Sequence, residues 1–147
     1  MGFRTDLLTG LGRHAAAAGI GTWNASGVYA AAQTAITVGA VPAAPDRLIT
    51  LSGYDVTNTF RTTDDVQGVQ VRCRWGGQDP RPVDDLDDAL FDLWHDADTF
   101  TLPTGVRVVL MERRSSTSLG QDGNGRWSRA SNYYLTVHRP SLHRTDD

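Results

Sequence analysis

The sequence predicts an α/β fold of the α+β kind, in which two helices pack on a mixed, mainly antiparallel sheet and a long β-hairpin protrudes near the C-terminus. Three observations predict it. Two segments carry apolar residues at helical spacing, a central segment alternates apolar and polar residues, and two long strand-like runs flank a Gly-rich turn. At 147 residues, the chain suits one domain over residues 1–147.

The first predicted element is an amphipathic helix from Gly2 to about Ala18. Its apolar stripe consists of Phe3, Leu7, Leu8, Leu11, Ala15 and Ala18. Gly10 and Gly12 loosely fit a dinucleotide-binding fingerprint, but that motif needs a preceding strand, and none precedes them here. We therefore expect both glycines inside the helix, at a close packing contact.

Three strands are expected next, at residues 35–38, 47–56 and 66–75. In the last, Val69, Val71, Cys73 and Trp75 share one face while polar side chains take the other. This alternation predicts a strand with one buried face, on which Cys73 behaves as a small apolar residue.

A second helix is expected after Asp79 and Pro80, which suit a helix start. The residues Val83, Leu86, Leu90, Leu93 and Ala97 repeat at helical spacing, and aspartates cover the remaining surface. Carboxylates crowded on an exposed helix usually only solvate it, although they can also pair with cations of another copy.

Charge and composition narrow the functional classes. The formal net charge is −3, which gives no overall attraction to nucleic acid or to an anionic membrane, and no apolar run is long enough to span a bilayer. The chain has one cysteine, so an internal disulfide or zinc knuckle is excluded. We expect synthesis in a reducing cytoplasm.

The last two strands, 106–118 and 126–138, are expected to be about twice the usual strand length. Because residues 112–131 are mostly polar, we expect this part to extend as an arm, followed by a tail at 139–147. An isolated two-stranded ribbon is marginally stable, so the arm is expected to gain order on a neighbouring copy. The expected interface consists of Arg113, Arg114, Leu119, Arg126, Trp127 and Arg129 of the arm, facing Asp84, Asp85 and Asp88 of the neighbour's helix.

No catalytic or metal-binding constellation is found in the sequence. Asp122-Gly-Asn-Gly resembles the opening of a calcium loop, but the later ligand and glycine positions hold Arg126, Trp127 and Tyr133, so the motif predicts a turn. His14, His95, His138 and His143 lie far apart on separate predicted elements. We expect no cofactor and no metal.

These residues resemble those of a known family. The segment from Val66 to Pro80, the Asp-rich helix, and the run from Arg113 to Val137 are similar to small minor capsid or tail terminator proteins of long-tailed bacteriophages with GC-rich hosts. The resemblance implies a non-enzymatic virion protein at the tail–neck junction. It further implies a homo-oligomer, a hexameric ring, which contacts the tail tube and neck proteins while DNA passes through transiently.

Two other readings stay open at this stage. A head-closure or adaptor ring of the neck shares the size and fold class. A small hydrolase or sugar-binding module could use Trp23, Trp75, Trp94 and Trp127 together with aspartates, although two of these tryptophans lie on predicted apolar faces.

Overall fold

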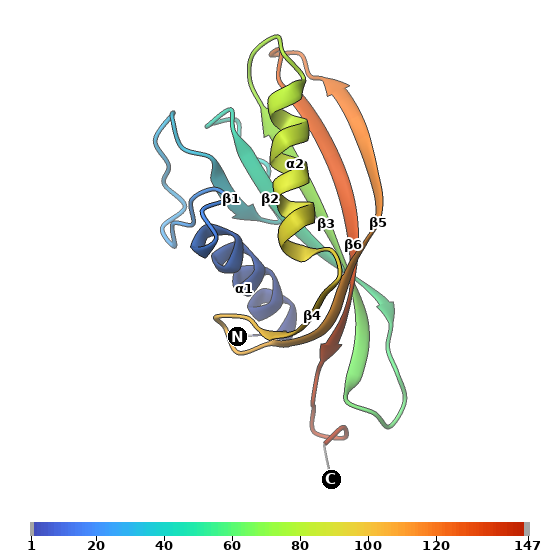
Figure 1. Cartoon of the computed structure of the whole chain (residues 1–147). Helices are drawn as coiled ribbons and strands as arrows, with labels where there is room; N and C mark the ends of the chain where they lie inside the picture. The colour runs from blue at the N-terminus through green and yellow to red at the C-terminus, as the bar shows by residue number, and fades with distance from the viewer. Residues whose placement is uncertain (1, 146–147) are drawn as a thin grey trace.

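The computed structural model describes residues 2–145 and contains two helices and one six-stranded sheet (Figure 1). In chain order the elements are α1 (Phe3–Ala17), β1 (Ala35–Val38), β2 (Leu48–Thr57), β3 (Asp64–Trp75), α2 (Arg81–Trp94), β4 (Ala97–Thr101), β5 (Arg107–Gln121) and β6 (Trp127–His138). The predicted fold class, two helices on a mixed and mostly antiparallel sheet, is confirmed.

The strands lie in the order β1-β2-β3-β6-β5-β4. Only the pair β1 and β2 is parallel, and every other neighbouring pair is antiparallel. The long strands β3, β6, β5 and β2 therefore form the centre of the sheet, while the short strands β1 and β4 lie at its two edges. The whole sheet is strongly twisted and curled (Figure 1).

Both helices pack on the same face of the sheet (Figure 1). Because strand side chains alternate between faces, one residue in two along β3 and β6 points toward them. Val69, Val71 and Cys73 of β3 and Tyr133 and Leu135 of β6 are fully buried there. Cys73 is thus a core residue, as its place in the alternation predicts, and burial raises the pKa of its thiol.

The two glycines inside α1 mark where the helix touches the turn from β4 to β5 and the ring of Trp23. A Cβ on Gly10 would lie 2.5 Å from Thr104 Oγ1 and 2.8 Å from the Cβ of Leu102, and one on Gly12 would lie 2.9 Å from the ring of Trp23. The small residues let the helix approach more closely than a larger side chain allows. The expected packing contact is confirmed.

The second helix is shorter than predicted. It ends at Trp94, and Ala97, which continues the helical spacing, instead begins β4. The chain turns between them at Asp96, whose φ of 62° lies in the left-handed region and is incompatible with a continuing helix. Periodicity alone could not reveal this turn, and strand β4 was not predicted.

The C-terminal hairpin is as long as predicted, but the prediction that residues 112–131 stand away from the domain is wrong. Strand β6 pairs with β3 along its whole length, from Asp64 opposite His138 to Trp75 opposite Trp127. The distal part of the hairpin is therefore the distal part of the central sheet, and α2 lies across it (Figure 1).

The opposite end of the sheet carries the loop between β2 and β3 and the residues after β6 (Figure 1). Arg144 joins the two: its guanidinium lies 2.6 Å from a carboxylate oxygen of Asp65, whose side chain is fully buried. Of the predicted tail at 139–147, residues 146 and 147 lie outside the described part of the chain. No helix within residues 2–145 is long and apolar enough to cross a membrane.

Candidate functional site in the distal half of the sheet

A polar cluster replaces the apolar core beneath the N-terminal half of α2. Its centre is Asp87, which is only 2% exposed. The hydroxyl of Ser131 donates to one carboxylate oxygen of Asp87 at 2.6 Å, while Ser116 and Arg113 contact the other at 3.2 and 3.1 Å. A buried carboxylate needs such donors. The helix and strands β5 and β6 are thus held together by hydrogen bonds as well as by apolar contacts.

A second ion pair lies at the rim of this cluster. Arg129 of β6 donates from Nε to Asp84 of α2 at 2.9 Å and from Nη1 to the hydroxyl of Ser116 at 3.0 Å. Together with Asp87, Asp88 and Arg113, these residues line an open polar groove of about 370 Å³. Three carboxylates and two guanidinium groups line this groove, and two of the carboxylates, Asp84 and Asp87, are paired with its arginines.

The tip of the hairpin is a tight turn, as the Asp-Gly-Asn-Gly motif predicts. One carboxylate oxygen of Asp122 accepts from the backbone N–H groups of Asn124 and Arg126 at 2.9 and 3.0 Å, and Gly125 has a φ of 76°. The N–H of Arg126, foremost among these donors, holds the pKa of Asp122 below its ordinary value. The turn is fastened to the rest of the chain, since Arg126 also donates to the carbonyl of Ala43.

The predicted interface residues fall into two groups. Five are engaged within their own subunit. Arg113 pairs with Asp87, Arg126 pairs with Asp122, and Arg129 pairs with Asp84, which is itself one of the predicted residues. Trp127 packs against the core and donates its indole N–H to the carbonyl of Gln78 at 3.2 Å. Pairing between arginines of the hairpin and aspartates of the helix was expected across two copies, whereas the structure forms it inside one.

The other predicted residues face solvent. Leu119 is 50% exposed on β5, and Asp85 and Asp88 are exposed on α2. Arg114 is exposed as well, pairs with Glu112 at 3.0 Å, and covers the ring of Tyr134. These four residues remain available for contact with another molecule.

The outer side of β5 is open over much of its length. Strand β4 pairs with β5 only from Arg107 to Met111. Beyond that point, the backbone N–H of Arg113 donates to Nδ1 of His95 at 3.0 Å. No strand within residues 2–145 pairs with 115–121 on this side of β5. Strand β2 has a similar open stretch, because β1 pairs with it only from Leu48 to Leu51.

Sequence reasoning missed both open edges. Edge position depends on which strands become neighbours, and the strand pattern of β2 or β5 contains no signal for it. The one hint is compositional: 115–121 contains neither a charged residue nor a proline, the residues that usually protect an exposed edge.

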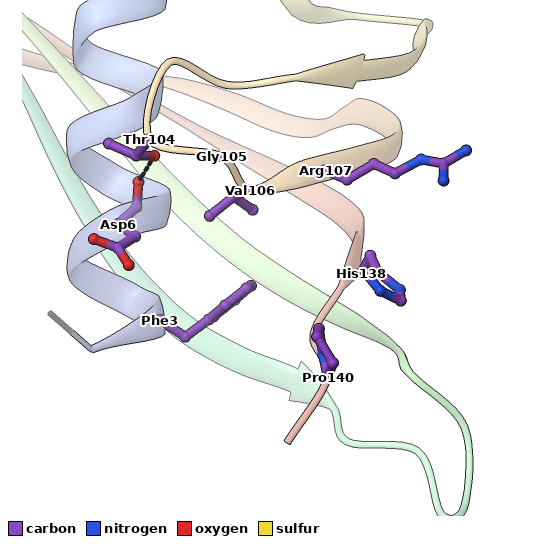
Figure 2. A pocket seen from close by; sticks show the side chains of 8 residues that line it. All are labelled: Phe3, Asp6, Thr104, Gly105, Val106, Arg107, His138 and Pro140. Atoms are coloured by element: carbon purple, nitrogen blue, oxygen red, sulfur yellow. Dashed lines mark hydrogen bonds between the residues drawn. The ribbon is translucent and has the colours of Figure 1, made fainter. Parts of the chain in front are cut away.

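A second groove, of about 360 Å³, lies between the start of α1, the turn from β4 to β5 and the end of β6. Figure 2 shows Phe3 and Val106 in its wall, Thr104 bonded to the carbonyl of Asp6, and Arg107 extending away from it. The bond from Thr104 ties the turn between β4 and β5 to the start of α1.

The remaining candidates for chemistry lie apart from each other. The neutral His14 is paired with the indole of Trp94, and burial lowers the pKa of His14. In the described range 2–145, no three His, Cys, Asp or Glu side chains gather closely enough to hold a metal ion. Trp94 is fully buried and Trp23 packs on α1, so the four tryptophans do not form a shared platform for a sugar.

Comparison with known proteins gives one family match. Residues 15–139 match the model of a family described as bacteriophage tail terminator protein. A solved structure titled "Virion of native gene transfer agent (GTA) particle" contains a chain with a TM-score of 0.54 and 15% identity; the match covers 69% of this chain and 78% of that one. At this identity the likeness is one of fold. No curated protein sequence matches.

Proposed function

Because the chain belongs to the bacteriophage tail terminator family, and is thus a structural component of the phage tail and the virion, we propose that it ends the tail as a closed ring of identical copies. The single observation that carries this proposal is the family match over 125 residues, from 15 to 139, which includes α2 and all six strands and begins near the C-terminal end of α1. The resemblance noted from the sequence puts the number of copies at six.

The shape of the subunit supports a scaffold. The sheet, the two helices and the distal hairpin form one continuously paired unit, fastened by the Asp87 cluster and by the turn at Asp122. Open strand edges, and the exposed side chains Arg114, Leu119, Asp85 and Asp88, remain for contacts outside the subunit. A rigid subunit with two different contact surfaces suits head-to-tail assembly. Such an assembly closes into a ring when the rotation from each copy to the next divides a full turn evenly.

We further propose that the ring contacts the tail tube on one side and a neck protein on the other, that DNA passes through its lumen, and that the protein performs no catalysis. Support for a structural role comes from the family. The family match favours this position over that of a head-closure or adaptor ring.

The test is tail length. Phage produced without this protein are expected to form tail tubes of irregular length that do not join filled heads, and supply of the wild-type protein in trans restores a single length. Electron microscopy of the particles measures both properties. Tails of uniform length, joined to heads in the absence of the protein, would contradict the proposed function.

A further inference from the structure

We infer that neighbouring copies join through their open sheet edges: residues 115–121 of β5 in one copy pair, antiparallel, with residues 52–57 of β2 in the next. The inference deepens the proposed function, since it rests on assembly of identical copies. It replaces the interface expected from the sequence, in which arginines of the hairpin meet aspartates of the neighbour's helix.

The β5 edge is a template for pairing. Met111 is the last residue of β5 that pairs with β4, and the open edge begins after it. The exposed residues along this edge are Ser115, Thr117, Ser118 and Leu119. Register shifts at 113/115 and 118/120 bend the strand at both ends, but pairing with β6 is regular from Ser115 to Ser118. Native proteins rarely leave an edge of this length without charges, prolines or a cover, because it can pair with another chain.

The β2 edge offers the complementary half. Beyond Leu51, the last residue paired with β1, no strand of the described chain pairs with 52–57 on this side. Tyr54 and Val56 are each 37% exposed there, and on β5 Leu119 is 50% exposed. Joining the two edges would shield Val56 and Leu119, whose burial contributes to association, whereas the ring of Tyr54 lies over Gly68 and its hydroxyl bonds Asn132 of β6.

Strand direction favours this pair of edges. Strands β2 and β3, β3 and β6, and β6 and β5 are each antiparallel, so β2 and β5 of one copy run in opposite directions. When copies are related by rotation about an axis along the strands, β5 of one and β2 of the next therefore meet antiparallel. Such a contact uses unlike surfaces and leaves one of each edge for the following copy.

The covered halves of the two edges determine how the copies are offset. Across the paired strands β5, β6, β3 and β2, Thr117 lies level with Thr50. The open residues 115–121 of β5 therefore lie level with the part of β2 that β1 covers. To pair, the next copy must shift along the strands by about five residues, roughly 16 Å at the rise of an extended strand. A closed ring accommodates this stagger if its strands tilt relative to the ring axis, as in a barrel.

Cysteine cross-linking in purified tails tests the pairing. Val56→Cys and Thr117→Cys are combined in one chain and treated with a short bismaleimide. The native Cys73 gives no background, because it is fully buried and burial raises its thiol pKa. The double variant is expected to form a ladder of cross-linked multimers, whereas each single variant forms none, since the two positions meet only between copies.

The matched control combines Thr117→Cys with Asp85→Cys, at an exposed residue on α2. A ladder from this pair but not from Val56→Cys with Thr117→Cys would overturn the edge pairing and restore the helix as the partner surface. If the Val56→Cys, Thr117→Cys protein forms tails of regular length but gives no ladder, the edge pairing is overturned and the proposed function stands. The proposed function is tested separately, by the tail lengths of phage produced without this protein.

If the cysteine variants fail to enter tails, amide hydrogen exchange of the wild-type protein tests the pairing of the two edges instead. Backbone hydrogen bonds formed at the joint are expected to slow exchange in 115–121 and 52–57 by about tenfold or more in tails relative to the free protein. Residues 35–38 of β1, already paired, serve as the internal reference. Equal exchange rates in free and assembled protein at both edges would overturn the inference.

Discussion

At the scale of single residues, the buried carboxylate of Asp87 explains how so polar a hairpin packs against α2. Hydrophobicity patterns treat serine and arginine as surface residues, so 112–131 was expected to be exposed. In the structure, Ser116, Ser131 and Arg113 are the donors that a carboxylate buried beneath α2 requires. The pairing of arginine with helix aspartate was predictable from charge; that it occurs within one subunit was not.

The first prediction concerns this cluster. Asp87→Ala is expected to lower the free energy of unfolding by about 2–4 kcal/mol, because it leaves Arg113 and two serine hydroxyls without their shared acceptor. Urea denaturation of the purified protein measures the loss. The control is Asp88→Ala, an exposed neighbour on the same helix, for which a change within about 0.5 kcal/mol is expected. Equal effects of the two substitutions would contradict the role of Asp87.

The second prediction concerns acid stability at the other end of the sheet. Burial by itself raises the pKa of Asp65, but hydrogen bonds from Arg144, the Thr59 N–H and Asn58 outweigh it and lower this pKa from 3.8 to about 2. A lowered pKa stabilises the folded state fully above about pH 4, and this contribution is lost as pH falls toward 2. The shift corresponds to about 2 kcal/mol.

Asp65→Asn is therefore expected to be less stable than wild type at pH 6 and to lose about 2 kcal/mol less between pH 5 and pH 2. Chemical denaturation between pH 2 and pH 6 measures how the free energy of unfolding of each protein depends on pH. Asp98→Asn, at an exposed carboxylate on β4, is expected to follow the wild-type profile. An Asp65→Asn profile parallel to that of wild type would show that Arg144 does not hold this carboxylate ionised.

At the scale of elements, helices and long strands followed from the sequence because their periodicity is carried by residues that pack on one core. The helix at 3–17 and the strand at 64–75 begin and end within a few residues of the expected positions. Strand β4 could not be predicted: it has five residues, and Ala97 also fits the spacing of the preceding helix. The extended backbone of His95 and the left-handed conformation of Asp96 separate them.

The third prediction tests the contact between α1 and the turn from β4 to β5. Gly10→Ala is expected to destabilise the protein by about 1–3 kcal/mol, because the added Cβ would meet Thr104 Oγ1 and Leu102 at distances that force them to shift. This cost exceeds the roughly 1 kcal/mol that alanine gains over glycine in a helix. Thermal unfolding measures the difference. A Gly10→Ala protein as stable as wild type would contradict this close contact.

At the scale of the whole molecule, the sequence supported the fold class and the family, while the arrangement of the candidate interface depended on topology. Placing β6 between β3 and β5 moves Trp127, Arg126 and Arg129 into intramolecular contacts. The same topology leaves 115–121 and 52–57 as open edges. Neither outcome is encoded in a local pattern, because both depend on which strands become neighbours.

The central claim is that copies of this domain close the phage tail as a ring. A cryo-electron microscopy map of the particle tests it most directly. The account predicts a ring of this fold at the end of the tail tube nearest the head, with one continuous ladder running from β5 of each copy to β2 of the next. Density for the fold elsewhere in the particle, or as an isolated subunit at that position, would contradict it.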